Sequence, residues 1–339
     1  MLLIMMNNTS PFVSMMQMLS GFQLSQALYT MAELDVPALL LDKPRTVEEL
    51  ADVTEANADA LGRVIRFLET VGVFRVSNGI VEVTDLGATL ADGAPGGSAR
   101  GIARFWMETH YAPFGDLLHT VRTGGNAATH HFGKPFYDWV AEKPRLVELQ
   151  NAAMGDGGNA IRDTALANYR LPGNGTVADI GGADGNVLAQ LLAGDPQRRG
   201  IVFDLPEVVA GSHPVLAAAG LTARVDVVGG DFFEAVPSAD VYVMSQTLHN
   251  WNDDGCLRIL DNIAKVALSG TRLVVVEMVV PEDSSPHPSK SIDLVMLAML
   301  DGRDRTATEW QRLPQAGGFT LDRIIERPSP MSIIEATLR

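Results

Sequence analysis

Short apolar runs alternate with stretches of helical spacing from Thr176 onward. The runs are TVADIGG, GIVFDL, RVDVVGGD, DVYVMSQ and TRLVVVEMVV. Near-continuous apolar runs separated by helical segments are typical of parallel strands that are covered on both faces. The last two runs, FTLDRIIERPS and MSIIEATL, are separated only by a short Pro/Ser turn. Residues 173–339 are therefore predicted to form a doubly wound, Rossmann-like α/β domain that ends in an antiparallel hairpin.

The first part of the chain, residues 1–100, has helical spacing with weaker strand signals at its end. Half of the 14 methionines lie before residue 32. Apolar side chains recur near helical intervals at Met15, Leu19, Phe22, Leu28 and Met31. A Met-rich stripe of this kind is either core or a face that is buried against a second subunit.

Two helices and a hairpin are predicted between residues 46 and 85. Thr46 and Glu49 make a capping box for a short helix, and a second helix spans about 57–71. The strands after it alternate around Asn78-Gly79, which favours a tight turn. This pattern is that of a winged helix, for which DNA binding is the obvious function. Residues 42–85, however, hold five Lys/Arg against nine Asp/Glu and would repel phosphates, so we expect a dimerisation domain.

Residues 101–172 are predicted to be a helical linker that lines the substrate. They contain helical pieces punctuated by Gly and Pro and rich in aromatics, such as ARFWMETHYAPFG and KPFYDWV. Phe105, Trp106 and His110 are candidates for lining an acceptor pocket, although such clusters are more often core.

Composition narrows the class of protein and its partners. The chain has 339 residues, 46% hydrophobic, and a net charge of −15, which argues against nucleic acid as a partner. The single cysteine, Cys256, makes no internal disulfide and favours a reducing, cytoplasmic setting. The apolar start MLLIMM has no basic residue before Lys43, so no secretory signal is expected, and no stretch is long enough to span a membrane. The pair His130-His131 has no third metal ligand nearby in the sequence. We therefore expect it to lie in a loop and to bind no metal.

A glycine-rich turn follows the first predicted strand of the sheet, in ADIGGADGNV. Gly181, Gly182 and Gly185 allow a tight turn and a close approach to a ligand. The dinucleotide spacing G-x-G-x-x-G is absent, so a dehydrogenase is disfavoured. Asp179 and Asp184 flank the glycines and would oppose a pyrophosphate. They suit a cofactor that carries a sulfonium and an ammonium group, which describes S-adenosylmethionine.

Carboxylates also follow the next two predicted strands. Asp204 lies about 20 residues beyond the glycine turn, where it either binds both ribose hydroxyls or caps the helix after Pro206. Asp231 and Phe232 end the third strand and suit an adenine amino group and ring face. Three carboxylates at three successive strand ends favour S-adenosylmethionine over caps alone. The candidate cofactor set is completed by Leu205, Gly230 and Ser245.

The stretch SQTLHNWNDDG places a histidine at a junction between a strand and a helix. Asn252 or Asp253 can cap the helix that starts near Asp254, and Trp251 is expected to anchor the turn. His249 precedes the cap at the carboxyl end of a strand, so it is free to serve as a general base.

The chain resembles the plant caffeic-acid and flavonoid O-methyltransferases and their bacterial relatives that act on aromatic natural products. The landmarks are DIGGADG, FDLP, GDFF, LHNWND and DRTATEW. The resemblance implies methyl transfer from S-adenosylmethionine to a hydroxyl, usually phenolic, and a homodimer interlocked through the amino-terminal domain. It implies that His249 is the catalytic base and that Glu277 and, less directly, Glu309 flank and orient it. It implies acceptor-binding positions at Asn151, Met154, Met296 and Met299.

Several positions sharpen or depart from this resemblance. Glu277 ends the strand next to the histidine, so we expect its carboxylate on the far ring nitrogen, although it could be a surface residue. Asn250 stands where many members have Asp, Ser245 where many plant members have Lys, and Leu300 where some have Asn. The change at Asn250 leaves open a relative that hydroxylates or guides a pericyclic reaction. A DNA-binding regulator is the third hypothesis.

Overall fold

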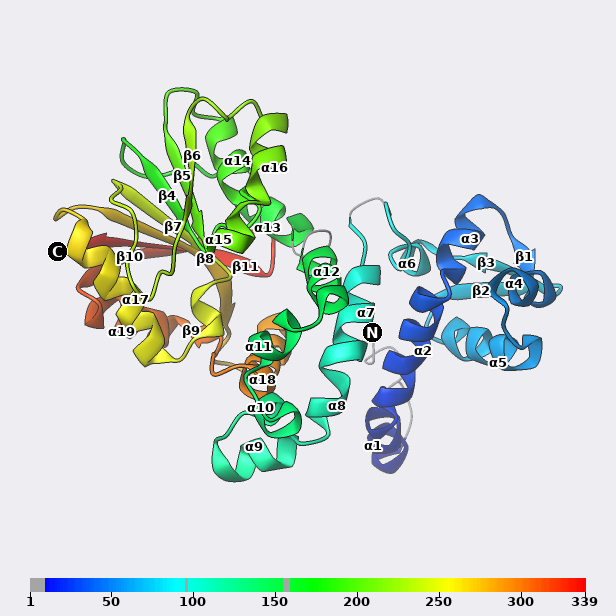
Figure 1. The fold of residues 1–339 in the computed structure, drawn as a ribbon. Helices are drawn as coiled ribbons and strands as arrows, with labels where there is room; N and C mark the ends of the chain where they lie inside the picture. The colour runs from blue at the N-terminus through cyan, green and yellow to red at the C-terminus, as the bar shows by residue number, and fades with distance from the viewer. Residues whose placement is uncertain (1–9, 95–96, 155–158) are drawn as a thin grey trace. The chain divides into compact units, whose positions relative to one another are not determined.

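A computed structural model describes residues 10–94, 97–154 and 159–339 (Figure 1). Contacts within the chain group these residues into two compact units. The amino-terminal unit comprises the residues up to Gly115 together with Tyr137–Ala160, and the sheet unit comprises Asp116–Phe136 and Ile161–Arg339. The predicted linker, 101–172, is thus shared between the two units. The apolar start MLLIMM lies outside the described residues.

Helices and a small sheet form the amino-terminal unit. The helices before the small sheet's hairpin are α1 (Pro11–Leu19), α2 (Gly21–Glu33), α3 (Val36–Asp42), α4 (Val47–Thr54) and α5 (Ala58–Glu69). The strands are β1 (Arg45–Thr46), β2 (Phe74–Ser77) and β3 (Ile80–Val83), in the order β1-β3-β2. The later helices are α6 (Asp85–Ala88), α7 (Arg100–Thr109), α8 (Tyr111–Phe114) and α12 (Pro144–Ala153), and α11 (Phe136–Ala141) begins at the boundary between the units.

The predicted helix, helix and hairpin are confirmed in this unit. Thr46 and Glu49 form the reciprocal capping box at the start of α4. Between β2 and β3, Asn78 and Gly79 both have positive φ, 51° and 79°, as a two-residue hairpin turn requires. The side chains that α5 buries in the core of the unit recur every three or four residues: Leu61, Ile65 and Leu68.

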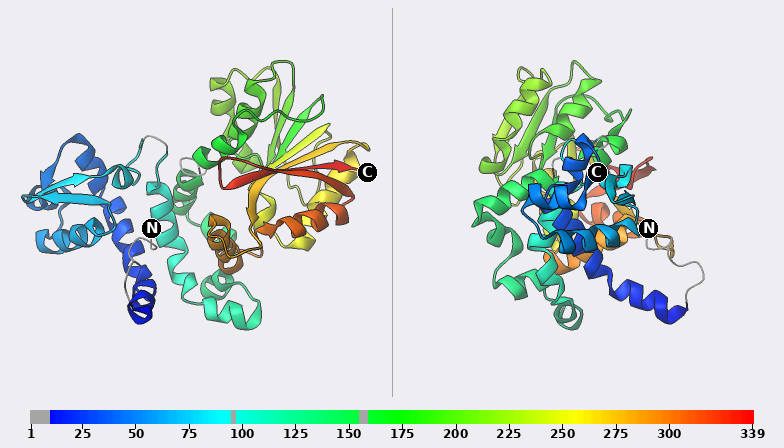
Figure 2. Two further views of the ribbon diagram at one scale, coloured as in Figure 1. Left: turned by 180° about the vertical axis from the view of Figure 1, so that it is seen from behind. Right: turned by 90° about the vertical axis from the view of Figure 1, so that its right-hand side faces the viewer.

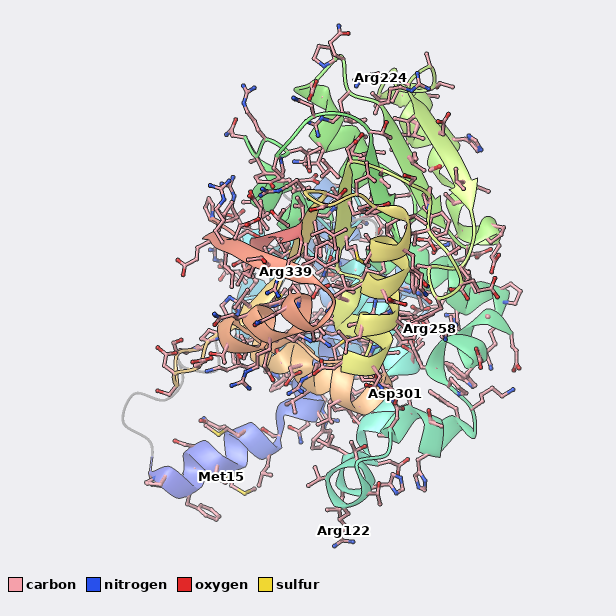
Figure 3. The ribbon with its side chains drawn as sticks, turned by 90° about the vertical axis from the view of Figure 1, so that its left-hand side faces the viewer. Met15, Arg122, Arg224, Arg258, Asp301 and Arg339 are labelled. Atoms are coloured by element: carbon pink, nitrogen blue, oxygen red, sulfur yellow. The ribbon has the colours of Figure 1, made fainter. Side chains whose placement is uncertain are left out.

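The Met-rich stripe is divided between core and surface. Met31 is fully buried in α2, whereas Met15 and Phe22 are each 55% exposed. Figure 3 shows Met15 on α1, where none of the helix's own residues is buried. The core interpretation is therefore confirmed for Met31, whereas burial of the exposed part of the stripe against a second subunit stays a prediction.

The sheet unit contains an eight-stranded sheet with the order β10-β11-β8-β7-β4-β5-β6, and β9 pairs with β8. Its strands are β4 (Val177–Ile180), β5 (Gly200–Asp204), β6 (Val225–Gly229), β7 (Val241–Ser245), β8 (Arg272–Val280), β9 (Arg305–Thr306), β10 (Phe319–Glu326) and β11 (Met331–Leu338). β4 to β8 are parallel, whereas β10 and β11 form the predicted antiparallel hairpin, which joins β8 through β11.

Helices cover both faces of this sheet (Figures 1 and 2). On one face α13 (Asn159–Leu166), α14 (Asn186–Ala193) and α16 (Ser212–Ala218) pack through a core that includes Leu188 and Leu216. On the other face α17 (Asp253–Val266) and α19 (Ala307–Ala316) pack through Ile259 and Trp310. The remaining helices of the unit are α9 (Leu117–Thr123), α10 (Ala127–Phe132), α15 (Pro206–Val209) and α18 (Pro288–Met299), with a 3₁₀ turn at Leu248–Asn250.

The strand order locates the ligand edge of the sheet. The chain runs outward from β4 through β5 to β6, and then returns to the other side of β4 with β7 and β8. The order therefore reverses between β4 and β7, and ligands of such sheets bind at the carboxyl ends of the strands near this point.

The expected loop position of His130 and His131 is wrong, because both residues lie in α10. Asn126 caps this helix by accepting from Thr129 N–H, and Gly133 ends it in the left-handed region. The polar cap and the terminal glycine that bound this short helix are residue types that loops also favour, so the sequence alone does not separate the two.

Candidate active site

The glycine turn after β4 is packed against the end of β7. Gly181 and Gly185 have φ of +74° and +77°, and even Ala183 has φ +43°. A side chain at Gly181 would place its Cβ 2.8 Å from Thr247 Oγ1. Only glycine fits both the backbone conformation and this close approach. The glycine turn therefore packs directly against Thr247, in the segment that leads to His249.

Asp179 lies beneath this turn as a buried carboxylate. It is 1% exposed, and neither of its oxygens has a hydrogen-bond partner among the described residues. Burial raises its pKa to about 7, against the lowering effect of Arg162. A carboxylate that is buried without a partner is costly unless a ligand supplies a cation or donors. An ammonium group satisfies this requirement, so the residues present fit S-adenosylmethionine.

Asp204 joins the end of β5 to the same turn. Its Oδ2 accepts from Ala183 N–H at 3.0 Å, and its Oδ1 accepts from Leu205 N–H at 2.8 Å. Burial raises the pKa of Asp204, and the two backbone hydrogen bonds oppose this. α15 has no side-chain cap, so the alternative that Asp204 caps this helix is not what the structure shows.

The end of β6 provides an aromatic surface. Asp231 Oδ1 accepts from Phe233 N–H at 2.7 Å, and Phe232 stands edge-on to Trp251 with ring centroids 6.0 Å apart. Trp251 also packs on Phe233, which confirms it as the anchor of its turn. A Cβ at Gly230 would lie 2.7 Å from the Phe203 ring, so a larger residue there would displace this surface.

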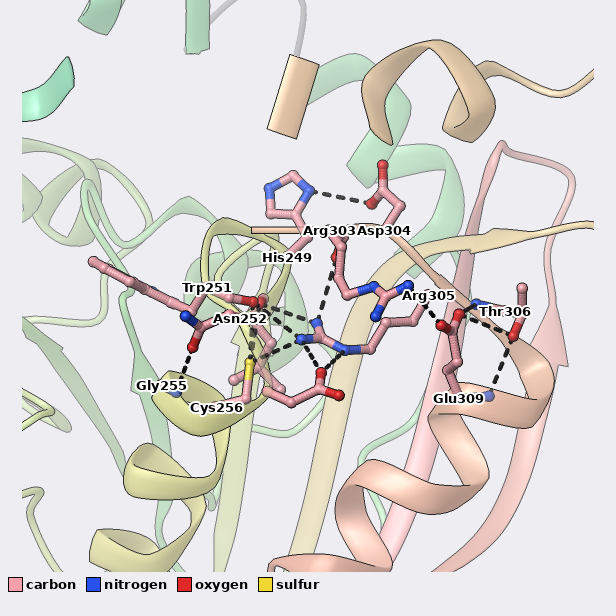
Figure 4. A network of polar contacts seen from close by, with 12 residues as sticks. His249, Trp251, Asn252, Gly255, Cys256, Arg303, Asp304, Arg305, Thr306 and Glu309 are labelled. Carbon is pink, nitrogen blue, oxygen red and sulfur yellow. Dashed lines mark hydrogen bonds and ion pairs between the residues drawn. The ribbon is translucent and has the colours of Figure 1, made fainter. Parts of the chain in front are cut away.

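His249 lies in the 3₁₀ turn directly after β7 and is 8% exposed. Its Nδ1 lies 3.3 Å from Asp304 Oδ1 (Figure 4). Its backbone N–H donates to Glu277 Oε1 at 3.1 Å. Asn252 caps α17 by accepting from Gly255 N–H, as predicted. The histidine therefore sits between a strand end and a helix cap, with one ring nitrogen held by a carboxylate.

Electrostatics around His249 favour its protonated form. Burial alone lowers the pKa of His249, but the hydrogen bond to Asp304 and the charges of Glu277 and Asp304 raise it above its usual 6.5. Burial also raises the pKa of Glu277. A histidine in this setting readily accepts a proton and holds it against the carboxylate.

Two acidic residues occupy other positions than those expected. Glu277 holds the backbone of His249, so the expected contact with the ring nitrogen is not found, and Asp304 makes that contact instead. Glu309 closes a capping box with Thr306 at the start of α19 and pairs with Arg303, away from the ring. The sequence interpretation missed Asp304, although it lies in the quoted run DRTATEW.

The other candidate residues fall in both units. In the amino-terminal unit Phe105 and His110 are buried and stand edge-on at 5.3 Å, and burial lowers the pKa of His110 to about 3, which fits the core alternative. Trp106 lies on α7 beside them, whereas Asn151 on α12 and Met154 after it are exposed. In the sheet unit Met296 and Met299 are buried on α18. Near the cofactor edge Ser245 has a buried hydroxyl with no partner among the described residues, and Leu205 is 42% exposed.

Neither a metal-binding cluster nor a membrane-spanning helix is found within residues 10–94, 97–154 and 159–339. No group of three or more His, Cys, Asp or Glu side chains in these ranges is arranged to hold a metal ion. None of the helices described there is long and apolar enough to cross a membrane.

A doubly wound sheet with a glycine turn and carboxylates at its strand ends defines an α/β enzyme that binds a nucleoside cofactor. The chain belongs to the O-methyltransferase family, because residues 114–320 match the O-methyltransferase domain and residues 16–93 match the O-methyltransferase dimerisation domain.

Three relatives illustrate this family. The phenazine O-methyltransferase of Lysobacter antibioticus is 37% identical over 95% of both chains. The 8-amino-8-demethylriboflavin N,N-dimethyltransferase of Streptomyces davaonensis is 34% identical over 91% of this chain and 90% of that one. A solved structure in this family is that of CalO1, a methyltransferase in calicheamicin biosynthesis, bound to S-adenosylhomocysteine. It is 33% identical to this chain, and the match covers 98% of this chain and 100% of CalO1 with a TM-score of 0.86.

Proposed function

We propose that this protein transfers a methyl group from S-adenosylmethionine to a hydroxyl, most simply phenolic, of an aromatic small molecule, with His249 as general base. The observation that carries this proposal is a buried imidazole whose Nδ1 meets Asp304, directly after a strand that borders the glycine turn. Membership of the O-methyltransferase family supports the reaction class.

The cofactor is held, in this proposal, by the strand-end carboxylates. Asp179 pairs with the ammonium group, because its oxygens have no other partner among the described residues. Asp204 accepts from the ribose hydroxyls, and Asp231 and Phe232 bind the adenine. S-adenosylmethionine supplies, when bound, a methyl group that is already activated by the positive sulfur.

The protein's own contribution is to position the acceptor and to remove its proton. His249 Nε2 accepts the hydroxyl proton as the new oxygen–carbon bond forms and the sulfur–carbon bond breaks. The proton on Nδ1 faces Asp304, which fixes the tautomer and stabilises the imidazolium. Glu277 holds the histidine backbone and adds a second negative charge. Glu309 acts on His249 only indirectly. It forms an ion pair with Arg303, whose backbone N–H donates to the carbonyl of His249.

The acceptor is proposed to be planar and largely apolar, since the relatives include a phenazine O-methyltransferase. Candidate lining residues are Phe105, Trp106, His110, Asn151, Met154, Met296 and Met299. The match to the dimerisation domain and the exposed apolar side chains of α1, among them Met15 and Leu19, support a homodimer. We place the reaction in the cytoplasm, because the one cysteine is free and buried.

Labelled S-adenosylmethionine and a panel of phenols, with matched anilines, test this function. We expect label on oxygen and one S-adenosylhomocysteine formed per product. His249→Ala should lower turnover by roughly 10²–10⁴-fold and leave the affinity for S-adenosylmethionine unchanged. Products formed without S-adenosylhomocysteine would favour the hydroxylating or pericyclic alternative, and equal turnover by the variant would refute the assignment of the base.

Asn250 does not favour that alternative on its own. Its Nδ2 donates to the carbonyl of Gln246, so the side chain stabilises the turn rather than contacting the imidazole. The negative charge that the family often has at this position is absent, but Asp304 and Glu277 already provide two carboxylates beside His249.

A further inference from the structure

The segment from Gly302 to Arg305 lies directly against the turn that carries His249. Arg303 N–H donates to the carbonyl of His249 at 2.8 Å. At Gly302 the two backbones are so close that a Cβ would lie 2.0 Å from the same carbonyl oxygen. Asp304, which follows Arg303, lies with its Oδ1 3.3 Å from Nδ1 of the His249 ring. One short segment therefore contacts both the backbone and the side chain of the proposed base.

Arg305 extends this contact to both sides of the histidine. Its Nη1 donates to the carbonyl of Leu248 at 3.2 Å, and its Nη2 donates to the carbonyl of Trp251 at 3.0 Å (Figure 4). Nε and Nη2 both donate to Asp253 Oδ1 in the first turn of α17, at 3.1 and 2.8 Å. The planar guanidinium thus joins the residue before His249, the residue two positions after it, and the start of the next helix.

Arg305 itself is fixed by the sheet. It lies in β9, opposite Val279 of β8, and its side chain is 1% exposed. β8 also carries Glu277, whose carboxylate accepts a hydrogen bond from the backbone N–H of His249. The turn that carries His249 is therefore hydrogen-bonded both to β8, through Glu277, and to β9, through Arg305.

A buried arginine is a poor choice for stability alone. Burying a cation is costly, and well-packed apolar residues often stabilise a fold as well as a buried ion pair does. Its ion-pair partner Asp253 is 58% exposed, and the buried carboxylate of Glu277 also compensates the charge of Arg305. What a guanidinium provides, and a lysine does not, is several donors in one fixed plane.

We propose that Arg305 is a positioning residue for the proposed methyl transfer, because its guanidinium holds the Leu248 and Trp251 carbonyls and so keeps the His249 ring against Asp304. The inference rests on the proposed function in naming His249 as the base. Arg305 contacts no substrate in this role and acts only through the turn.

Three variants separate positioning from charge and from stability. Arg305→Lys keeps the charge but not the planar set of donors, and Arg305→Met removes both. Arg224→Met is the matched control, because Arg224 and Arg305 each donate to three backbone carbonyls: those of Leu192, Asp195 and Arg198 for Arg224, and those of Leu248, Trp251 and Arg303 for Arg305. Arg224 precedes β6 at the amino edge of the sheet, far from the labelled Asp301 near the His249 turn (Figure 3).

Positioning predicts a loss of kcat with little change in binding. Both Arg305 variants should lower kcat by roughly 10- to 100-fold, as misplacement of a reacting group does. The acceptor KM and the calorimetric affinity for S-adenosylmethionine should change less than about twofold. The acid limb of the kcat–pH profile should move to lower pH in Arg305→Lys, because the ring loses the hydrogen bond that raises its pKa. Added guanidinium ion should partly restore Arg305→Met, and Arg224→Met should keep wild-type kcat.

Two results would overturn the inference. If Arg305→Lys keeps wild-type kcat and pH profile, Arg305 acts through its charge or not at all. If the loss of kcat in the Arg305 variants follows only the fraction of folded protein, or if Arg224→Met loses kcat to the same extent, the role of Arg305 is structural.

A readout that does not need activity separates this inference from the proposed function. The His249 imidazole can be titrated by NMR in histidine-labelled protein, with His249→Gln to assign it among the seven histidines. A lower ring pKa in Arg305→Lys supports the positioning role even if no phenol is methylated. An unchanged titration, together with methyl transfer by the wild type, refutes the positioning role and leaves the proposed function standing.

Discussion

Binding of S-adenosylmethionine is predicted to release a proton from Asp179. In the unliganded protein burial raises the pKa of this carboxyl to about 7, so it is largely neutral below neutral pH. To pair with an ammonium group it must ionise. Cofactor affinity is therefore expected to fall as the pH falls through about 7, where protonation of Asp179 competes with binding.

The size of the effect follows from the pKa. Well below about 7 the apparent dissociation constant should rise about tenfold for each pH unit, or about 1.4 kcal/mol. Between about pH 5 and pH 7 this amounts to somewhat less than 100-fold. The α-amino group of the cofactor stays charged over this range, because such groups titrate near 8.

Titration calorimetry in buffers of different ionisation enthalpy measures this proton directly. We expect close to one proton released on binding at about pH 6 and much less at about pH 8. Asp179→Asn should bind weakly but without this pH dependence, which separates Asp179 from Asp204 and the histidines. Affinity that is flat across the range in the wild type, or a variant with the same slope, would refute the reasoning.

The same shift makes a prediction for the unliganded fold. A carboxyl whose folded pKa lies above its unfolded value of 3.8 stabilises the fold at low pH, and this contribution is lost as the pH rises through about 7. Above neutral pH, Asp179→Asn should therefore unfold at a higher temperature than the wild type. Its free energy of unfolding should be larger by as much as roughly 4 kcal/mol. At about pH 4 the two proteins should unfold at similar temperatures.

Three further variants test other contacts. Asp304→Asn should lower kcat by roughly 10²–10⁴-fold and shift the acid limb of its pH profile downward, since the carboxylate raises the pKa of His249; an unchanged profile would contradict this. Gly302→Ala should lower kcat with normal cofactor affinity in calorimetry, because its Cβ would meet the His249 carbonyl oxygen at 2.0 Å; wild-type kcat would show that the close contact between Gly302 and His249 does not matter for turnover. Glu335→Ala should destabilise the protein by about 2–3 kcal/mol in thermal melts with unchanged kcat, because it removes the buried partner of Tyr169, Arg272 and Arg323.

Much of the sheet could be predicted from the sequence because its signals are local. Each parallel strand is a short and mainly apolar run, and the runs quoted from the sequence contain β4 to β8. The terminal hairpin was predicted from the brevity of its turn, and the helix that Asn252 caps was predicted from the cap. Burial on both faces produces such runs, so the pattern and the architecture have one physical cause.

The acidic partners of His249 could not be assigned in the same way. Which carboxylate reaches a ring depends on how β9 aligns with β8, and this register is a non-local property. Asp304 and Glu309 both lie in DRTATEW, and the family resemblance implies Glu309 rather than Asp304. A local signal did exist, because Thr306 and Glu309 have the spacing of a capping box, as Thr46 and Glu49 do. That spacing assigns Glu309 to its own helix.

Negative charge at the carboxyl edge of the sheet also constrains the acceptor. Glu277 and Asp304 both flank His249, and Asp179 and Asp204 follow from the neighbouring strands. A phenolate bound beside these groups would be repelled, whereas the positive cofactor is attracted. In the proposed reaction, the acceptor should therefore enter as the neutral phenol and lose its proton only as the methyl group is transferred. Under that condition removal of the proton cannot be left to solvent, and the orientation of His249 by Asp304 becomes decisive for the rate.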